Sequence, residues 1–280
     1  MTPEPPSPPL DLLVVGGLTV DRFADGTTAP GGSVLHAALA ARDAGRRVGI
    51  VSVAGPEPEA AAGVDELARL PWTAIARADR SIVFAHEETA ARRSLVLIDP
   101  GVAITNVPAV EARAVLYAPV AGEVGAPLLA QRPAEAVGAA ILQGWLRTLT
   151  PGAAVAPIPV AAVQADVAAA LRGFDLVVVS REDLAADGPD PAAQLDTLRQ
   201  ALGDGPAIVL TDGTAGAWLE HRGRWHAEVP RVVEGGTVGA GDMLAALLAV
   251  DWPRLADTES LRRRMADAMR AVADRLAGHR

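Results

Sequence analysis

Residues 232–250, VVEGGTVGAGDMLAALLAV, run from a glycine-rich turn directly into an apolar segment with helical spacing. The glycines of the turn, among them Gly239 and Gly241, can adopt positive φ and let the backbone approach a ligand closely. The apolar residues from Met243 onward fit a buried helix face. We therefore expect the turn to lead into a helix N-terminus.

Asp242 stands at the start of that expected helix. Backbone N–H groups at a helix N-terminus lack intrahelical partners and the helix dipole is positive there, so such a site suits a phosphate group. A carboxylate at this position has two interpretations. It can cap the helix, or it can act as a base beside a phosphate that is being transferred.

The composition points to an α/β protein. The chain has 280 residues, which suits one large domain or two small ones. Hydrophobic residues make up 50% of the chain but aromatic residues only 3%, so Ala, Val, Leu and Ile must build the core. Such a core is readily layered as helices on a mostly parallel sheet.

Charge and residue usage exclude several classes of function. The net charge of −9 disfavours a surface for nucleic acid. The absence of cysteine removes thiolate nucleophiles, disulfides and Cys-ligated zinc. All 25 basic residues are Arg, which excludes a Walker A lysine, a protein-kinase ATP lysine and a Schiff-base lysine. Phosphate chemistry in this chain must therefore use backbone N–H groups, Arg and metal.

The N-terminal segment is rich in proline and has no basic region. We expect residues 1–10 to form a disordered leader rather than a signal peptide, with one domain over 11–280. The most apolar long run, residues 151–171, is broken by prolines, Gln164 and Asp166 and cannot span a membrane. The simplest expectation is a cytoplasmic protein without a membrane partner.

The first third of the chain predicts a strand, helix, strand unit. A strand over 12–17 ends in Gly-Gly, a helix follows over 33–44, and a second strand covers 48–53. Ligands bind beyond the carboxyl ends of parallel strands, so Asp21 is a candidate site residue, although a role in a turn is an equal alternative. His36 lies on the first turn of the helix, where a histidine is usually structural.

Residues 72–98 break this alternation with short strands separated by turn residues. We interpret them as an antiparallel flap over the carboxyl edge of the main sheet, and an ordinary edge hairpin is the alternative. The later elements are predicted from their patterns: strands over 114–118, 139–143, 175–179, 207–210, 217–221 and 224–229, and helices over 160–171, 191–202 and 259–277.

Taken together, these pieces resemble the ribokinase-like (PfkB) carbohydrate kinase family. The resemblance rests on Asp21 after the first strand, Gly31-Gly32 before a helix, a β flap, the Thr-Asp-Gly-x-x-Gly turn at 211–216 and Gly-Ala-Gly-Asp at 239–242. It implies a three-layer sandwich in which helices cover both faces of a mostly parallel sheet, with a small β flap as a lid.

The resemblance also implies a role for each matching residue. Asp242 would be the catalytic base, and the N–H groups of Gly239, Ala240 and Gly241 would hold the developing charge. The acceptor would meet Asp21, Gly31, Gly32 and His36. The nucleotide would meet Thr211, Asp212, Gly213, Gly216 and Thr237, and Asp183 would belong to the magnesium network.

Three features depart from the family pattern. Ser-Arg-Glu-Asp at 180–183 stands where Asn-x-x-Glu is usual, Gly236 replaces an Asp, and His36 replaces an Asn. Residues 141–147, ILQGWLR, resemble the D-x-Q-G-x-x-R stretch of some members, including relatives of inositol kinases, with Ile141 in place of the acid. The same segment can be read as a strand end packed by Trp145.

The resulting hypothesis is an ATP-dependent and Mg²⁺-dependent kinase that phosphorylates a hydroxyl of a small sugar or polyol. An inositol or nucleoside kinase is a variant of it, and a catalytically inactive nucleotide- or sugar-binding protein is the alternative. A dinucleotide-binding role is disfavoured because Gly16-Gly17 lacks the G-x-G-x-x-G pattern. The expected partner is a small molecule, not nucleic acid, and a homodimer is a possible assembly.

Overall fold

The computed structural model describes the chain except for residues 1–5, 90–91, 229–237, 253–256 and 279–280. Its strands are β1 (Leu10–Val15), β2 (Thr19–Phe23), β3 (Thr28–Gly31), β4 (Val48–Ala54), β5 (Trp72–Arg77), β6 (Ile82–Thr89), β7 (Arg92–Pro100), β8 (Ala112–Tyr117), β9 (Val137–Ile141), β10 (Leu176–Ser180), β11 (Ala207–Thr211), β12 (Ala217–His221) and β13 (Arg224–Glu228). The α-helices are α1 (Ser33–Asp43), α2 (Pro58–Leu67), α3 (Ala126–Leu129), α4 (Ala165–Leu171), α5 (Pro191–Leu202), α6 (Ala240–Asp251) and α7 (Thr258–Gly278).

A nine-stranded sheet forms the centre of the molecule, with the strand order β13-β12-β11-β10-β9-β8-β1-β4-β5. The strands from β5 to β11 in this order run parallel, and only β12 and β13 pair antiparallel. The prediction of a mostly parallel central sheet is confirmed.

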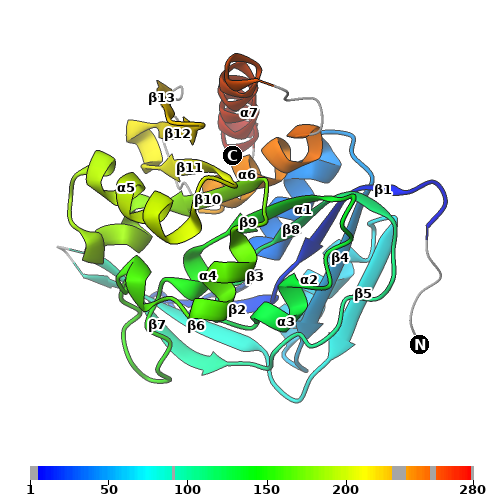
Figure 1. Ribbon diagram of the computed structural model, residues 1–280. Coiled ribbons are helices and arrows are strands. Elements are labelled where there is room, and N and C mark those ends of the chain that lie inside the picture. Colours follow the sequence, from blue (N-terminus) through cyan, green and yellow to red (C-terminus); the bar gives the residue numbers. More distant parts are fainter. Residues whose placement is uncertain (1–5, 90–91, 229–237, 253–256, 279–280) are drawn as a thin grey trace.

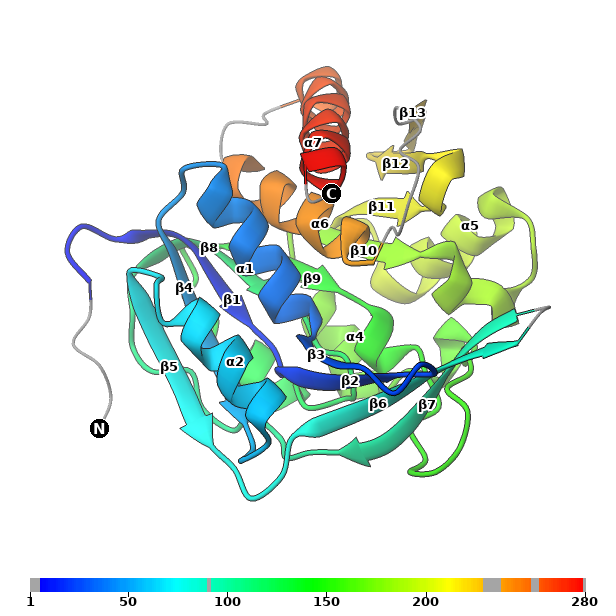
Figure 2. The same cartoon turned by 180° about the vertical axis from the view of Figure 1, so that it is seen from behind.

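Helices cover both faces of this sheet. Side chains alternate along β1, so that Leu12 and Val14 pack with α1, α2, α6 and α7, which lie in front in Figure 2. Leu13 and Val15 point the opposite way and pack with α3, α4 and α5, which lie in front in Figure 1. Burial on both faces explains why the parallel strands are continuous apolar runs. The expected three-layer sandwich is confirmed.

The flap is a separate four-stranded sheet with the order β3-β2-β6-β7, along the lower edge of Figure 1. It differs from the flap expected over 72–98 in two respects. Trp72–Arg77 is not part of it, because β5 pairs in parallel with β4 at the edge of the main sheet and Trp72 is buried there. Two further flap strands, β2 and β3, come from residues 19–31, between β1 and α1.

Three smaller differences concern the bounds of two elements and one helix that was not predicted. The helix expected over 160–171 is a 3₁₀ turn, Val160–Ala162, followed by α4, because Val163 and Gln164 between them are extended. Leu10, expected in the leader, is fully buried in β1. Helix α2, which begins with Pro58 in its first turn, is absent from the sequence prediction. Of the helices in the described ranges, none is both long and apolar enough to cross a bilayer.

Candidate active site

The candidate site lies at the carboxyl edge of the sheet, where Gly16 and Gly17 follow directly after β1. A Cβ atom on Gly16 would stand 2.4 Å from the carbonyl oxygen of Ala118, so the chain segments after β1 and β8 approach too closely for any side chain here. The Gly-Gly pair at the end of the first strand therefore has a packing reason. It brings the loop after β8 against the loop after β1.

Glu123, which the sequence does not single out, holds these two loops together. Its side chain accepts hydrogen bonds from the backbone N–H groups of Gly17 (2.8 Å), Val120 (3.1 Å) and Ala121 (2.8 Å). The residue is 3% exposed, and this burial raises the pKa of the carboxyl although the backbone donors oppose the rise. Glu123 thus fixes the floor of the site and has no free face for a ligand.

The glycine turn before α6 forms one wall of the site. Gly239 is the N-cap of α6 with φ 75°, in the left-handed region, and Ala240 is the first helical residue. A Cβ atom on Gly239 would stand 2.4 Å from Cγ of His36, so the His36 side chain on α1 packs directly against this turn. The N-termini of α1 and α6 therefore meet, while the earlier part of the turn, including Gly236 and Thr237, lies outside the described residues.

Asp242 lies in the first turn of α6 and is partly buried. Burial raises the pKa of its carboxyl, and the nearby carboxylate of Asp183 adds to the rise. His36, a hydrogen bond from the Ser33 hydroxyl and the charge of Arg147 act in the opposite direction. A carboxylate with a raised pKa is a better proton acceptor than an ordinary aspartate.

Residues 141–147 contribute to both the core and the site. Trp145 packs against the α3–α5 layer, and its indole N–H donates to the carbonyl of Val124 (2.7 Å), as the interpretation of a packed strand end expects. Gln143 donates its amide hydrogen to the Ser33 hydroxyl (2.5 Å), and Arg147 Nε donates to Asp183 Oδ1 (2.7 Å). The segment thus brings two polar side chains beside Asp242.

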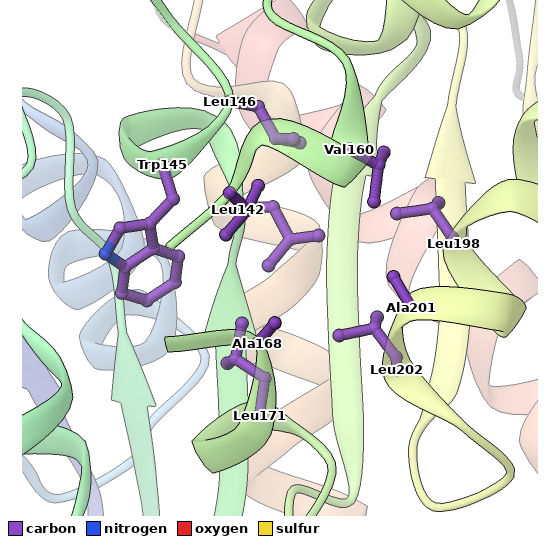
Figure 3. A pocket seen from close by; sticks show the side chains of 10 residues that line it. Leu142, Trp145, Leu146, Val160, Ala168, Leu171, Leu198, Ala201 and Leu202 are labelled. Carbon is purple, nitrogen blue, oxygen red and sulfur yellow. The ribbon is translucent and has the colours of Figure 1, made fainter. Parts of the chain in front are cut away.

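A small cavity of about 20 Å³ lies beneath this segment, as Figure 3 shows. Apolar side chains line it from the segment, from the 3₁₀ turn at 160–162 and the residue after it, from α4 and from α5: Leu142, Trp145, Leu146, Val160, Val163, Ala168, Leu171, Leu198, Ala201 and Leu202. None of these side chains can orient a phosphate or a sugar hydroxyl. The cavity is a packing gap in the core and is separate from the candidate site.

The residues predicted to meet the acceptor gather where the flap joins the sheet. Asp21 Oδ1 accepts a hydrogen bond from the Thr19 hydroxyl (2.9 Å), and a Cβ atom on Gly31 would stand 2.3 Å from Asp21 Oδ2. Gly32 has φ 99° and caps α1, where a Cβ atom would stand 2.4 Å from the carbonyl oxygen of Gly17. Each glycine is thus required by a close contact, and His36 follows on α1.

The residues predicted to meet the nucleotide lie on the turn after β11. Gly213 and Gly216 have φ 51° and 119°, and Asp212 pairs with Arg181 Nη1 at 2.5 Å. The Arg181 guanidinium in turn lies 5.6 Å from the ring centre of Trp218. Thr211 Oγ1 is 3.8 Å from the position that a Cβ atom on Gly241 would occupy. The turn therefore adjoins the N-terminus of α6, as expected if both bind one ligand.

Asp183, the residue assigned to magnesium, is engaged by Arg147 and its side chain is only 4% exposed. Within the described ranges, no group of three or more His, Cys, Asp or Glu side chains could hold a metal ion. Mg²⁺ is usually bound by one or two carboxylates together with phosphate oxygens and water. The described residues therefore do not fit a metal site of their own.

Comparisons with known proteins agree with this architecture. No protein-family model matches the chain, and no curated protein sequence does. Solved structures match it over nearly its whole length. A pyrophosphate-dependent myo-inositol-1 kinase, altered by mutation into a myo-inositol-3 kinase, has a TM-score of 0.77 at 17% identity and covers 95% of this chain and 93% of its own.

Two ribokinases also match. The enzyme of Arabidopsis thaliana, solved with ribose and ATP, has a TM-score of 0.68 at 15% identity over 93% of this chain and 92% of its own. The Thermotoga maritima enzyme has a TM-score of 0.69 at 12% identity over 96% and 93%. At these identities the likeness establishes the fold. The chain has the ribokinase-like fold that the sequence predicts.

Proposed function

We propose that this protein is a phosphotransferase that moves the terminal phosphoryl group of ATP to a hydroxyl of a small sugar or polyol. The observation that carries the proposal is the position of Asp242. Its carboxyl, with a raised pKa, lies in the first turn of α6 beside the glycine turn that ends at Gly239. A proton acceptor next to unpaired backbone N–H groups is what transfer between a hydroxyl and a phosphate requires.

In the proposed reaction, Asp242 takes the proton of the acceptor hydroxyl. The hydroxyl oxygen forms a bond to the terminal phosphorus while the bond to the leaving phosphate oxygen breaks. The N–H groups of Gly239, Ala240 and Gly241 hold the charge that develops on the phosphoryl oxygens. Such transfer depends mainly on positioning and electrostatic stabilisation, so a chain without lysine can carry it out.

The donor would lie across the turn at 211–216, and the acceptor beside Asp21, Gly31, Gly32 and His36. This division follows from the two groups of residues on either side of Asp242. The matching structures include a kinase solved with ribose and ATP and a pyrophosphate-dependent kinase of myo-inositol. We therefore propose ATP as the donor and include pyrophosphate in its test.

Mg²⁺ would accompany ATP in a kinase of this fold and neutralise charge on the phosphates. Because Asp183 pairs with Arg147, the described residues favour a guanidinium rather than a protein-bound metal beside Asp242. The mechanism proposed here assigns no step to a metal. Asp183 then acts by holding Arg147 in place.

A second candidate is a protein that binds the same ligands without turnover. The Asp183–Arg147 ion pair favours it, because the carboxylate expected to serve the metal is occupied. The two candidates differ in one observable, which is release of product. The acceptor panel must therefore be broad enough to make a negative result meaningful.

The test is a product-release screen of sugars, inositols and nucleosides with ATP and, separately, with pyrophosphate. Asp242→Asn should lower kcat by roughly 10²- to 10⁴-fold, the usual contribution of a general base, because it removes the proton acceptor. Donor affinity, measured by calorimetry with a nonhydrolysable analogue, should change little because Asn keeps the size and shape of Asp and because Gly239, not Asp242, caps α6.

Asp196→Asn, the same chemical change at an exposed position on α5, is the matched control and should leave kcat unchanged. Turnover by Asp242→Asn at the wild-type rate would contradict the proposed mechanism. A wild-type protein that binds donor and acceptor but releases no product would favour the second candidate.

A further inference from the structure

The inner face of the flap carries a polar side chain that the predicted acceptor residues do not include. Strand β2 runs parallel to β6, with Asp21 opposite Phe84 and Phe23 opposite His86. Side chains two residues apart on a strand point to the same face. Asp21, Phe23, Phe84 and His86 therefore share one face of the flap.

That face is turned toward the site. Phe84 and its neighbour Ile82 pack with Val120 and Ala121, in the loop that Glu123 fixes to the end of β1. Asp21 and His86 continue the same face beyond this apolar contact. Together with Thr19, they form the polar part of this flap face, beside the apolar contact of Ile82 and Phe84.

His86 is aimed at Asp21. Its Nε2 lies 3.5 Å from Asp21 Oδ2, and the two side chains are 19% and 16% exposed. Among the described residues, this buried Nε2 has no hydrogen-bond partner. Phe23 stacks on the imidazole with ring centres 4.8 Å apart and the planes 22° from parallel, which fixes the ring.

The Asp21 carboxylate is therefore approached from two sides. The Thr19 hydroxyl donates to Oδ1, and the imidazole edge of His86 faces Oδ2, next to Gly31. A carboxylate with one partner can still rotate about its side-chain bonds, whereas a second partner on the other oxygen limits it to one orientation. Such a fixed acceptor binds a hydroxyl donor at a lower entropic cost.

We propose that His86 is a positioning residue, which fixes Asp21 in the orientation that binds a hydroxyl of the acceptor and so sets acceptor affinity from the flap. The inference rests on the proposed function and deepens it, since it concerns the acceptor side of the same site. The ligand class is a polyhydroxylated molecule whose hydroxyl donates to Asp21. His86 acts through Asp21 and does not take part in phosphoryl transfer.

The test compares His86→Leu with His86→Gln, using D-ribose and myo-inositol as probes in calorimetry and in initial-rate measurements. His86→Leu should raise the Kd and KM of the acceptor about tenfold, because Asp21 loses the polar group that faces Oδ2 and can rotate away from the orientation that binds the acceptor. His86→Gln, whose amide nitrogen can replace Nε2, should stay within about threefold of the wild type. Donor Kd and kcat at saturating acceptor should be unchanged in both variants.

A double-mutant cycle with Asp21→Asn separates positioning from a general effect on the fold. Asp21→Asn with His86→Leu should bind acceptor no more weakly than Asp21→Asn alone, because His86 has nothing left to position. Additive losses, or wild-type acceptor affinity in His86→Leu, would overturn the inference while leaving the proposed function intact.

A wild-type protein that neither binds nor phosphorylates any acceptor of the full panel of sugars, inositols and nucleosides contradicts the proposed function instead. In that case the same four proteins are compared by thermal unfolding. Coupled losses of Tm support the Asp21–His86 contact, and additive losses reject it.

Discussion

Gly239→Ala tests whether the turn before α6 depends on glycine for the reason given above. The first cost is conformational: Gly239 has φ 75°, and a left-handed backbone costs an L-residue roughly 1–2 kcal/mol. The second is steric. The new Cβ would stand 2.4 Å from Cγ and 2.8 Å from Cβ of His36, and rotating the ring cannot move that Cβ. Overpacking of this kind costs about 1–3 kcal/mol.

The expected loss of unfolding free energy is therefore about 2–5 kcal/mol, the sum of the two costs. Urea unfolding of four proteins measures it. Gly152→Ala isolates the conformational cost, because Gly152 has φ 78° and a Cβ there would meet no heavy atom of the described residues within 4 Å. The loss of unfolding free energy in the Gly239→Ala and His36→Ala double variant, minus the loss in His36→Ala alone, should approach the loss in Gly152→Ala. A Gly239→Ala protein that loses no more stability than Gly152→Ala would refute the reasoning.

Three further predictions concern the charges around Asp242. The acidic limb of the pH profile of kcat should lie above the ordinary range of an aspartate, since burial raises the pKa of Asp242. His36→Asn should move this limb to higher pH, and Asp183→Asn should move it to lower pH. Limbs that stay in place in both variants would contradict the assigned contacts. The folded-state pKa of Asp242 lies above the ordinary 3.8, so this group contributes stability that is fully present below about pH 3.8 and is lost as the pH rises through the folded-state pKa. In urea unfolding, Asp242→Asn should therefore lose less unfolding free energy between acid and neutral pH than the wild type does. Asp183→Asn should also raise the KM of the donor several-fold, because it releases Arg147. The midpoint of a Mg²⁺ titration of the rate should not move. A shifted midpoint would indicate that Asp183 binds the metal.

The sequence predicts the layered architecture because the relevant signals are local. Continuous apolar runs mark strands buried on both faces, and Gly45 marks the end of the first helix. The flap shows the limit of such signals. Alternation identifies Trp72–Arg77 as a strand, but it cannot say which sheet the strand joins, and that depends on pairing with β4.

The same limit applies to the site. Asp242, Asp21 and Thr211 lie next to recognisable glycine turns, so their positions can be predicted from the chain. Glu123 and Arg147 act through partners that are 106 and 36 residues away in the sequence, at Gly17 and Asp183. No local pattern identifies such pairs, because only the folded sheet brings their loops together.

The flap contains two of the proposed acceptor residues, since Asp21 and Gly31 belong to β2 and β3. In a kinase with this arrangement, the acceptor site is complete only when the flap is closed, and the apparent affinity equals the intrinsic affinity multiplied by the fraction of molecules in the closed state. Ile82 and Leu97 hold the flap against Val120 and Ala121. Substitutions at these apolar residues can therefore raise or lower the apparent affinity for the acceptor by changing the closed fraction alone. Every hydrogen bond to the acceptor then stays as it is.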